Sequence, residues 1–74
     1  MTMPPGTKRR IKSLIVGMPL GQTFTSRDMV AELKECFGID ASPHEVGSCI
    51  AQYNLQLVAI EKKDRRSPII WRRV

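Results

Sequence analysis

The stretch that decides the fold is LVAIEKKDRRSPIIWRR, residues 57–73. An apolar run at 57–60 leads into a charged segment at 62–66, and Ser67-Pro68 leads into a second run of β-favouring residues at 69–72. β-Branched and aromatic residues on both sides of a short polar break are typical of a two-stranded hairpin. The tip of this hairpin is expected to be strongly basic. Because an isolated hairpin is only marginally stable in water, we expect it to pack on other elements.

Three short amphipathic helices are predicted before the hairpin. Thr7 is expected to cap the first helix, and Gly17, Pro19 and Gly21 to end it. In each helix apolar residues recur at spacings of three and four, which places them on one face. The expected inward faces are Ile11, Leu14, Ile15 and Met18 in the first helix, Met29, Val30, Leu33 and Phe37 in the second, and Val46, Cys49, Ile50 and Tyr53 in the third.

The second helix is expected to follow Thr25 or Ser26 as its cap, with Asp28 in the first turn, where the helix dipole favours an anion. Residues 23–25 are too short to predict a strand, although Phe24 is expected to point inward. Gly38 suits the left-handed position that ends a helix, and Ile39 suits the apolar contact that accompanies such an end.

The third helix has the clearest start signal in the chain. Ser42 can cap it, Pro43 fits its first position, and Glu45 completes a capping box three residues after the serine. By subtraction a short and almost uncharged strip faces outward. Its residues are His44, Gly47, Ser48, Ala51 and Gln52.

In the hairpin, period-two alternation places two residues of each strand on the side that packs on the helices. These residues are Val58, Ile60, Ile69 and Trp71. Pro68 cannot donate a hydrogen bond to a neighbouring strand, but it is tolerated at the start of an edge strand.

The length of 74 residues suits one small domain, since a chain this short buries only about 60% of the surface that its unfolded state exposes. We expect a flexible tail at residues 1–6 and a folded domain at residues 7–74. No apolar stretch approaches the roughly 20 residues of a membrane span, and Gly17 and Pro19 interrupt the run that follows the basic N-terminus. We therefore expect no membrane segment and no signal peptide. A cytoplasmic protein is the default, and a nucleoid-associated one if the source is prokaryotic.

The distribution of charge is more informative than the net charge of +5. Residues 1–12 sum to +4, residues 13–61 to −4 and residues 62–74 to +5. Two basic ends around an acidic middle are typical of a nucleic-acid-binding protein. The same cations could instead form a solvated surface that keeps a hairpin edge from aggregating.

The predicted order of helix, short strand, helix, turn, helix and hairpin resembles the winged helix-turn-helix superfamily. The residues that carry the resemblance are 24–33, the segment 42–47 and the end of the hairpin at 70–72. It implies an α+β fold of three helices and a C-terminal hairpin wing. It also implies a double-stranded DNA-binding protein, such as a small transcriptional regulator. Its third helix would enter the major groove, and its wing would contact the backbone.

The resemblance implies two sets of contacts. The candidates for reading bases are Ser42, His44, Gly47, Ser48 and Gln52. The candidates for the DNA backbone are Lys62, Lys63, Arg65, Arg66, Arg72 and Arg73, joined by Lys8, Arg9 and Arg10. The last three could equally be the solvated start of a helix. Gln52 could pair with adenine through two hydrogen bonds. Gly47 costs about 1 kcal/mol relative to alanine inside a helix. Close approach to DNA and close packing on a neighbouring helix are equally good explanations for it.

Other functions remain as alternatives. A protein-interaction module of the same fold would bind its partner through the uncharged surface of the third helix and the acidic second helix. The second helix carries Asp28, Glu32 and Glu35. An accessory nucleic-acid-binding protein of replication is weaker, because few aromatic residues are free to stack on bases. A further hypothesis is a homodimer that binds two DNA half-sites. The contact between its two copies would come from Ile70 or from the segment 1–12.

No catalytic, metal or cofactor site is expected from the sequence. His44 is the only histidine, and Cys36 and Cys49 do not supply the spacing of a four-ligand metal site. We expect both cysteines to be buried thiols on apolar helix faces. A disulfide between them is less favoured.

Overall fold

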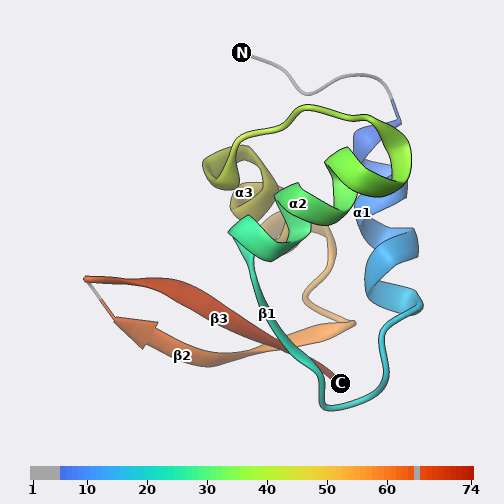
Figure 1. Cartoon of the computed structure of the whole chain (residues 1–74). Helices are drawn as coiled ribbons and strands as arrows, with labels where there is room; N and C mark the ends of the chain where they lie inside the picture. Colours follow the sequence, from blue (N-terminus) through green and yellow to red (C-terminus); the bar gives the residue numbers. More distant parts are fainter. Residues whose placement is uncertain (1–5, 65) are drawn as a thin grey trace.

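The computed structural model describes residues 6–64 and 66–74, and Figure 1 shows the arrangement of its elements. Residues 1–5 of the predicted tail at 1–6, and the candidate contact Arg65, lie outside the described residues. The elements follow in the order α1 (Thr7–Val16), β1 (Thr23–Thr25), α2 (Ser26–Phe37), α3 (Pro43–Tyr53), β2 (Val58–Asp64) and β3 (Ser67–Arg73). The chain is therefore a small α+β protein, and the three helices were predicted to within a residue or two.

The three strands form one antiparallel sheet in the order β1-β3-β2. The predicted hairpin is present, with Ile60 opposite Trp71, and β1 pairs with the other edge of β3 through Phe24 opposite Trp71. The short strand of the predicted element order is therefore present, although residues 23–25 alone did not predict it. Three residues carry too little periodicity to be recognised as a strand, and β1 exists because the free edge of β3 lies beside it.

The core lies between the three helices and one face of the sheet. Phe24, Val58 and Trp71 reach it from the strands, and each is at most 3% exposed. From the helices it receives Ile11, Ile15, Met29, Leu33, Val46, Cys49 and Ile50. Most of the inward faces predicted from periodicity are confirmed by this cluster.

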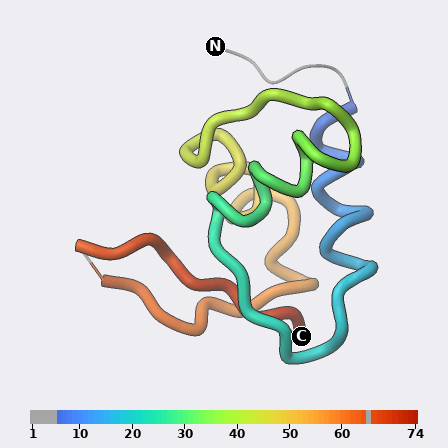
Figure 2. Tube along the Cα trace, viewed as in Figure 1, coloured from blue at the N-terminus to red at the C-terminus, as the bar shows by residue number. Residues whose placement is uncertain are grey.

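Ile60 was predicted to be in the core, but it is 49% exposed. The register of the hairpin shifts between Ile60 and Lys62, as expected for a β-bulge. Beyond this point the hairpin projects past the helices, as the trace in Figure 2 shows. On the far half of the hairpin, Ile69 still packs against the core, whereas residues 61–64 are exposed.

Two aromatic residues at helix ends were also predicted to be inward and are not. Phe37 is 38% exposed and Tyr53 is 57% exposed. Both lie at the last residue of a helix, where the apolar stripe continues but no neighbouring element covers it. A cation lies over each ring instead, with Arg10 4.7 Å from the Phe37 centroid and Lys8 Nζ 4.3 Å from the Tyr53 centroid.

The ends of α1 differ from the prediction in one respect. Gly6, with a φ of 84°, occupies the N-cap position, and Thr7 is the buried first residue of the helix. At the other end Gly17 is the C-cap as expected. The Arg73 guanidinium also donates a hydrogen bond from Nε to Ile15 O, at 2.9 Å. A cation at the C-terminal carbonyls of a helix is favoured by the helix dipole.

The ends of α2 follow the sequence signals. Thr25 is the N-cap, and its hydroxyl accepts a hydrogen bond from Asp28 N while Asp28 Oδ2 accepts one from Thr25 N. Gly38 ends the helix in the left-handed region at a φ of 66°. Ile39 N donates to Leu33 O, and the Ile39 side chain packs against the core.

Within the described residues, no helix combines the length and the apolar character needed to cross a membrane.

Candidate nucleic-acid interface

The side chains at the start of α3 hold this helix in place. Ser42 Oγ accepts a hydrogen bond from Glu45 N at 3.1 Å and donates one to Glu45 Oε1 at 3.0 Å. The glutamate therefore returns to the serine hydroxyl, whereas in a full capping box it would return to the serine backbone amide. Val46, Cys49 and Ile50 anchor the inner face of the helix in the core. This anchoring fixes which side chains α3 presents to solvent.

The outward strip of α3 is placed as the sequence predicted. His44, Ala51 and Gln52 are exposed, and Gly47 and Ser48 are half-buried. Of the base-reading candidates, Ser42 is the one whose hydroxyl is already occupied by the N-terminal cap of its own helix. The remaining polar side chains are free to contact a ligand.

Gly47 lies where α3 passes closest to the start of α2. A methyl carbon on Gly47 would lie 3.0 Å from Ser26 Oγ, which is closer than such contacts ordinarily come. Close packing of two helices therefore accounts for a glycine inside α3. Of the two explanations open at the level of sequence, packing on a neighbouring helix is the one for which the structure provides a contact.

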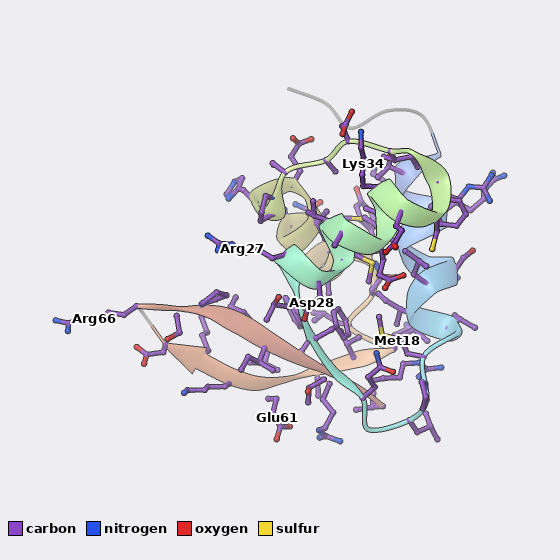
Figure 3. The ribbon with its side chains drawn as sticks, viewed as in Figure 1. Met18, Arg27, Asp28, Lys34, Glu61 and Arg66 are labelled. Carbon is purple, nitrogen blue, oxygen red and sulfur yellow. The ribbon has the colours of Figure 1, made fainter. Side chains whose placement is uncertain are left out.

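The basic hairpin differs from the predicted five-residue loop. The strands continue through Lys62 and Lys63 to Asp64, so both lysines are exposed strand residues. Asp64 Oδ1 accepts a hydrogen bond from Arg66 N at 3.2 Å and so steadies the turn. Arg66 lies at the tip and points away from the rest of the molecule (Figure 3). The positive charge is thus spread along the projecting end of the hairpin.

A groove of about 460 Å³ connects α3 to the hairpin. Gly47, Ser48 and Ala51 line it from the helix, and Pro68 and Ile69 line it from β3. The outward strip of α3 and the start of β3, close to the tip of the hairpin, therefore share one concave surface. We refer to it below as the hairpin groove.

Arg27 is a residue of the hairpin groove that the sequence analysis did not identify. It lies in the first turn of α2, is exposed, and lines the groove together with Ser26. Its side chain extends toward the same side of the molecule as the hairpin tip (Figure 3). No carboxylate of the described residues pairs with it. The capping signal at Thr25 was the sequence feature that bears on Arg27, because it placed this residue in the first turn of the second helix.

The opposite flank of α3 faces the start of α1. A shallow depression of about 210 Å³ lies there, and Gln52 and Tyr53 line it together with Lys8. Lys8 Nζ donates a hydrogen bond to the Tyr53 hydroxyl at 3.1 Å. His44 and Ser48 line both this depression and the hairpin groove. Four of the five predicted base-reading residues therefore line these two depressions, with Gly47 on the hairpin side of α3, Gln52 on its α1 side, and His44 and Ser48 between them; Ser42 lines neither.

The two arginines at the end of β3 are engaged within the protein. Arg72 Nε lies 2.8 Å from Glu61 Oε2 on the neighbouring strand. Arg73 donates hydrogen bonds to Ile15 O, Leu57 O and Val74 O. Arg10 covers Phe37, whereas Arg9 is exposed. Three of the predicted DNA-backbone contacts lie on the projecting hairpin and, within the described residues, have no hydrogen bond or ion pair from their side chains. They are Lys62, Lys63 and Arg66.

The acidic residues of α2 lie away from the hairpin groove. Asp28 and Glu32 line a different depression, between α1, β1 and α2, and no acidic residue lines the hairpin groove. Phosphate at the hairpin groove would therefore meet Arg27 before it met these carboxylates.

The two thiols have different surroundings, and both are free. Cys49 is buried as predicted, and its burial raises the pKa of the thiol, while the nearby Lys8 charge opposes this effect. Cys36 was predicted to be buried, but it is exposed in the last turn of α2, next to the exposed Phe37. Its pKa is raised by a hydrogen bond to the Glu32 carboxylate, 3.5 Å from Sγ, and by the charges of Glu32 and Glu35.

Nothing in the described part of the chain groups three or more histidine, cysteine or acidic side chains in an arrangement that could hold a metal ion. Comparison of the chain with protein-family models, with curated proteins and with solved structures finds no match in any of the three. The features of this chain that bear on its function are therefore its grooves and the charges around them.

Proposed function

We propose that this chain is a winged helix-turn-helix domain that binds double-stranded DNA and acts as a small transcriptional regulator. The observation that supports this most is the hairpin groove, in which the neutral outward strip of α3 and the start of β3, close to the basic hairpin tip, face the same space. The element order of helix, strand, helix, helix and hairpin is the one that the resemblance implied. The proposal gives the chain a binding role and no chemistry of its own.

In this proposal α3 enters the major groove. The major groove is about 12 Å wide and admits one helix. His44, Ser48 and Gln52 would then face base edges, and Ala51 could contact a thymine methyl group. Since α3 carries no Arg or Lys, base discrimination would come from neutral hydrogen bonds and apolar contact. Affinity would have to come from cations elsewhere.

Those cations are placed around the hairpin groove. Arg27 lies on its α2 side, and Lys62, Lys63 and Arg66 lie on the projecting hairpin. Contacts of lysine and arginine with phosphate supply most non-specific affinity, and each neutralised phosphate contributes about 0.9 to the slope of log K against log salt. We therefore expect binding that weakens steeply as salt increases.

The test is a fluorescence-anisotropy titration of a random-sequence duplex between 50 and 300 mM salt. We expect a negative slope of several units, reduced by about 0.9 in Arg27→Gln and again in Arg66→Gln. Lys34→Gln is the matched control, because Lys34 is equally exposed but pairs with Asp40 at 2.8 Å on another part of the surface. Binding that is absent or independent of salt would refute the proposal and favour a protein-interaction module.

Sequence reading by α3 needs a separate test. Selection from a pool of random duplexes would show whether the protein prefers particular bases. If α3 reads them, Gln52→Ala changes the preferred sequence, at a cost of about 1–3 kcal/mol for the lost contact. An unchanged preference in Gln52→Ala would place the reading elsewhere, and no preference at all would favour a general DNA-binding role.

A further inference from the structure

The second large depression of the molecule is a wedge between α1, β1 and α2, with a volume of about 570 Å³. Its apolar lining comes from Leu14 and Met18 of the α1 segment, Phe24 of β1 and Ala31 of α2. Asp28 and Glu32 form its acidic rim, and none of its lining residues in the described part of the chain is a lysine or arginine. Figure 3 shows Met18 and Asp28 on its two sides. It shares no lining residue with the hairpin groove.

Beside the wedge, α1 and the turn after it present an exposed stripe that is also apolar but carries positive charge. Val16 is 52% exposed and Leu20 is 76% exposed, the highest value among the large exposed apolar residues of the described chain. Arg9 and Lys12 lie on the same solvent-facing side of α1 as Val16, at helical spacings of seven and four residues. Both cations are exposed, and neither pairs with a carboxylate of the described residues.

We propose that this wedge is the homodimer interface of the protein and that its occupant is the α1 stripe of a second copy. Leu20 and Val16 of one copy would enter the apolar part of the wedge in the other. Arg9 and Lys12 would face its acidic rim. The wedge and the stripe are complementary in both polarity and charge.

Their position side by side is what favours a closed pair. A two-fold interface requires a single patch that is complementary to itself, so that each copy gives and receives the same contact. A wedge and a stripe on opposite sides of the molecule would instead build an open chain of copies. Here both belong to α1 and its immediate neighbours. The proposed occupant of the wedge is thus a second copy of this chain. Binding of a different basic protein there would be another outcome of the test and would count against the homodimer.

The consequence for DNA rests on the proposed function. Because the wedge shares no residue with the hairpin groove, a dimer formed through it leaves α3 and the hairpin of both copies uncovered. Two such domains related by a two-fold axis would recognise two half-sites arranged as an inverted repeat. The interfaces that the sequence suggested, Ile70 and the segment 1–12, differ from this one except at Arg9 and Lys12.

The test is sedimentation velocity of the full chain, without DNA, from about 5 to 500 μM at 50 and 500 mM salt. We expect a reversible dimer that weakens at high salt, since the charged rim is exposed to screening. Leu20→Asp should weaken dimerisation about tenfold or more, because a charge would enter the apolar part of the wedge. Leu55→Asp is the control, with a similarly exposed leucine (58%) away from the wedge. It should dimerise as the wild type does.

A charge exchange tests the pairing itself. Lys12→Glu and Glu32→Lys should each weaken the dimer, and the double variant should recover most of the loss. All of these residues are exposed, so the variants should fold, and circular dichroism would verify this. A protein that stays monomeric, or a dimer that Leu20→Asp leaves intact, would overturn the inference. Salt-dependent DNA binding by a monomer would refute the dimer alone, and a dimer that binds no DNA would refute the proposed function alone.

Discussion

The contact between Gly47 and Ser26 gives a quantitative prediction about the packing of α3 on α2. Alanine is favoured over glycine by about 1 kcal/mol inside a helix, so Gly47→Ala gains that amount if nothing opposes it. The new methyl carbon would lie 3.0 Å from Ser26 Oγ. Overpacking of this kind typically costs about 1–3 kcal/mol. In the wild-type background we therefore expect Gly47→Ala to be neutral or to destabilise the protein by up to about 2 kcal/mol.

Removing the opposing atom should reverse the sign. In a Ser26→Ala background the hydroxyl is absent, and Gly47→Ala should stabilise the protein by close to the full 1 kcal/mol of helix propensity. The coupling free energy between the two positions would then be about 1 kcal/mol or more, within the range found for residues in contact. Urea denaturation of the four proteins in this double-mutant cycle measures it. Ala51→Gly, at an exposed position of the same helix, measures the propensity contribution independently.

Two results would contradict this reasoning. Equal stabilisation by Gly47→Ala in both backgrounds would mean that Ser26 does not restrict the site. A stable Ser26→Ala/Gly47→Ala variant that has lost DNA affinity would mean that the glycine also serves close approach to a ligand. Retained affinity in the same variant would leave helix packing as its whole role.

Further predictions concern the ends of the elements and the thiols. In a urea titration, Arg73→Met should lower the free energy of unfolding by about 1.5–3 kcal/mol, the range for hydrogen bonds to charged groups. Arg72→Met breaks an exposed ion pair and should lower it by less than about 1 kcal/mol. Thr25→Ala should cost about 1 kcal/mol through loss of the α2 capping box, and no change in the denaturation midpoint would contradict the cap. Cys36 should be alkylated by iodoacetamide in the folded protein, and faster in Glu32→Gln because the carboxylate no longer raises its pKa; equal rates would show that Glu32 does not act on the thiol. Burial raises the pKa of Cys49, so the folded state retains the proton at pH values where the unfolded state loses it. The free energy of unfolding should therefore fall as pH rises above about 8.5, the ordinary thiol value, and should fall less in Cys49→Ala, where Cys36 is the thiol that remains.

The sequence predicted best what local signals control. Ser42, Pro43 and Glu45 marked the start of α3, and Gly38 marked the end of α2, because caps and left-handed glycines act within a few residues. Periodicity gave the inward faces in the middle of each helix. It failed at the last residues of helices, as at Phe37 and Tyr53. Periodicity shows which way a side chain points, but not whether another element lies opposite it.

The features that the sequence did not predict depend on contacts between distant segments. The β1 strand exists through its pairing with β3, and Arg27 belongs to the hairpin groove because the start of α2 lies against α3. Ile60 is exposed although it lies opposite the buried Trp71, because it belongs to the edge strand β2. Arg73 resembled a free basic residue, yet its partners are carbonyl groups 58 and 16 residues away in the chain. None of these relations leaves a local pattern.

The carboxylates of α2 would repel phosphate if the whole helix faced DNA. Successive residues of a helix point about 100° apart, so Arg27 and Asp28 can belong to different surfaces although they are adjacent in sequence. The structure uses this separation: Arg27 lines the hairpin groove, whereas Asp28 and Glu32 line the wedge beside α1. At physiological ionic strength exposed charges are screened over about 8 Å, so each groove interacts chiefly with its own charges. A net charge summed over residues 13–61 therefore says little about either surface, because one helix gives a cation to one groove and two anions to the other.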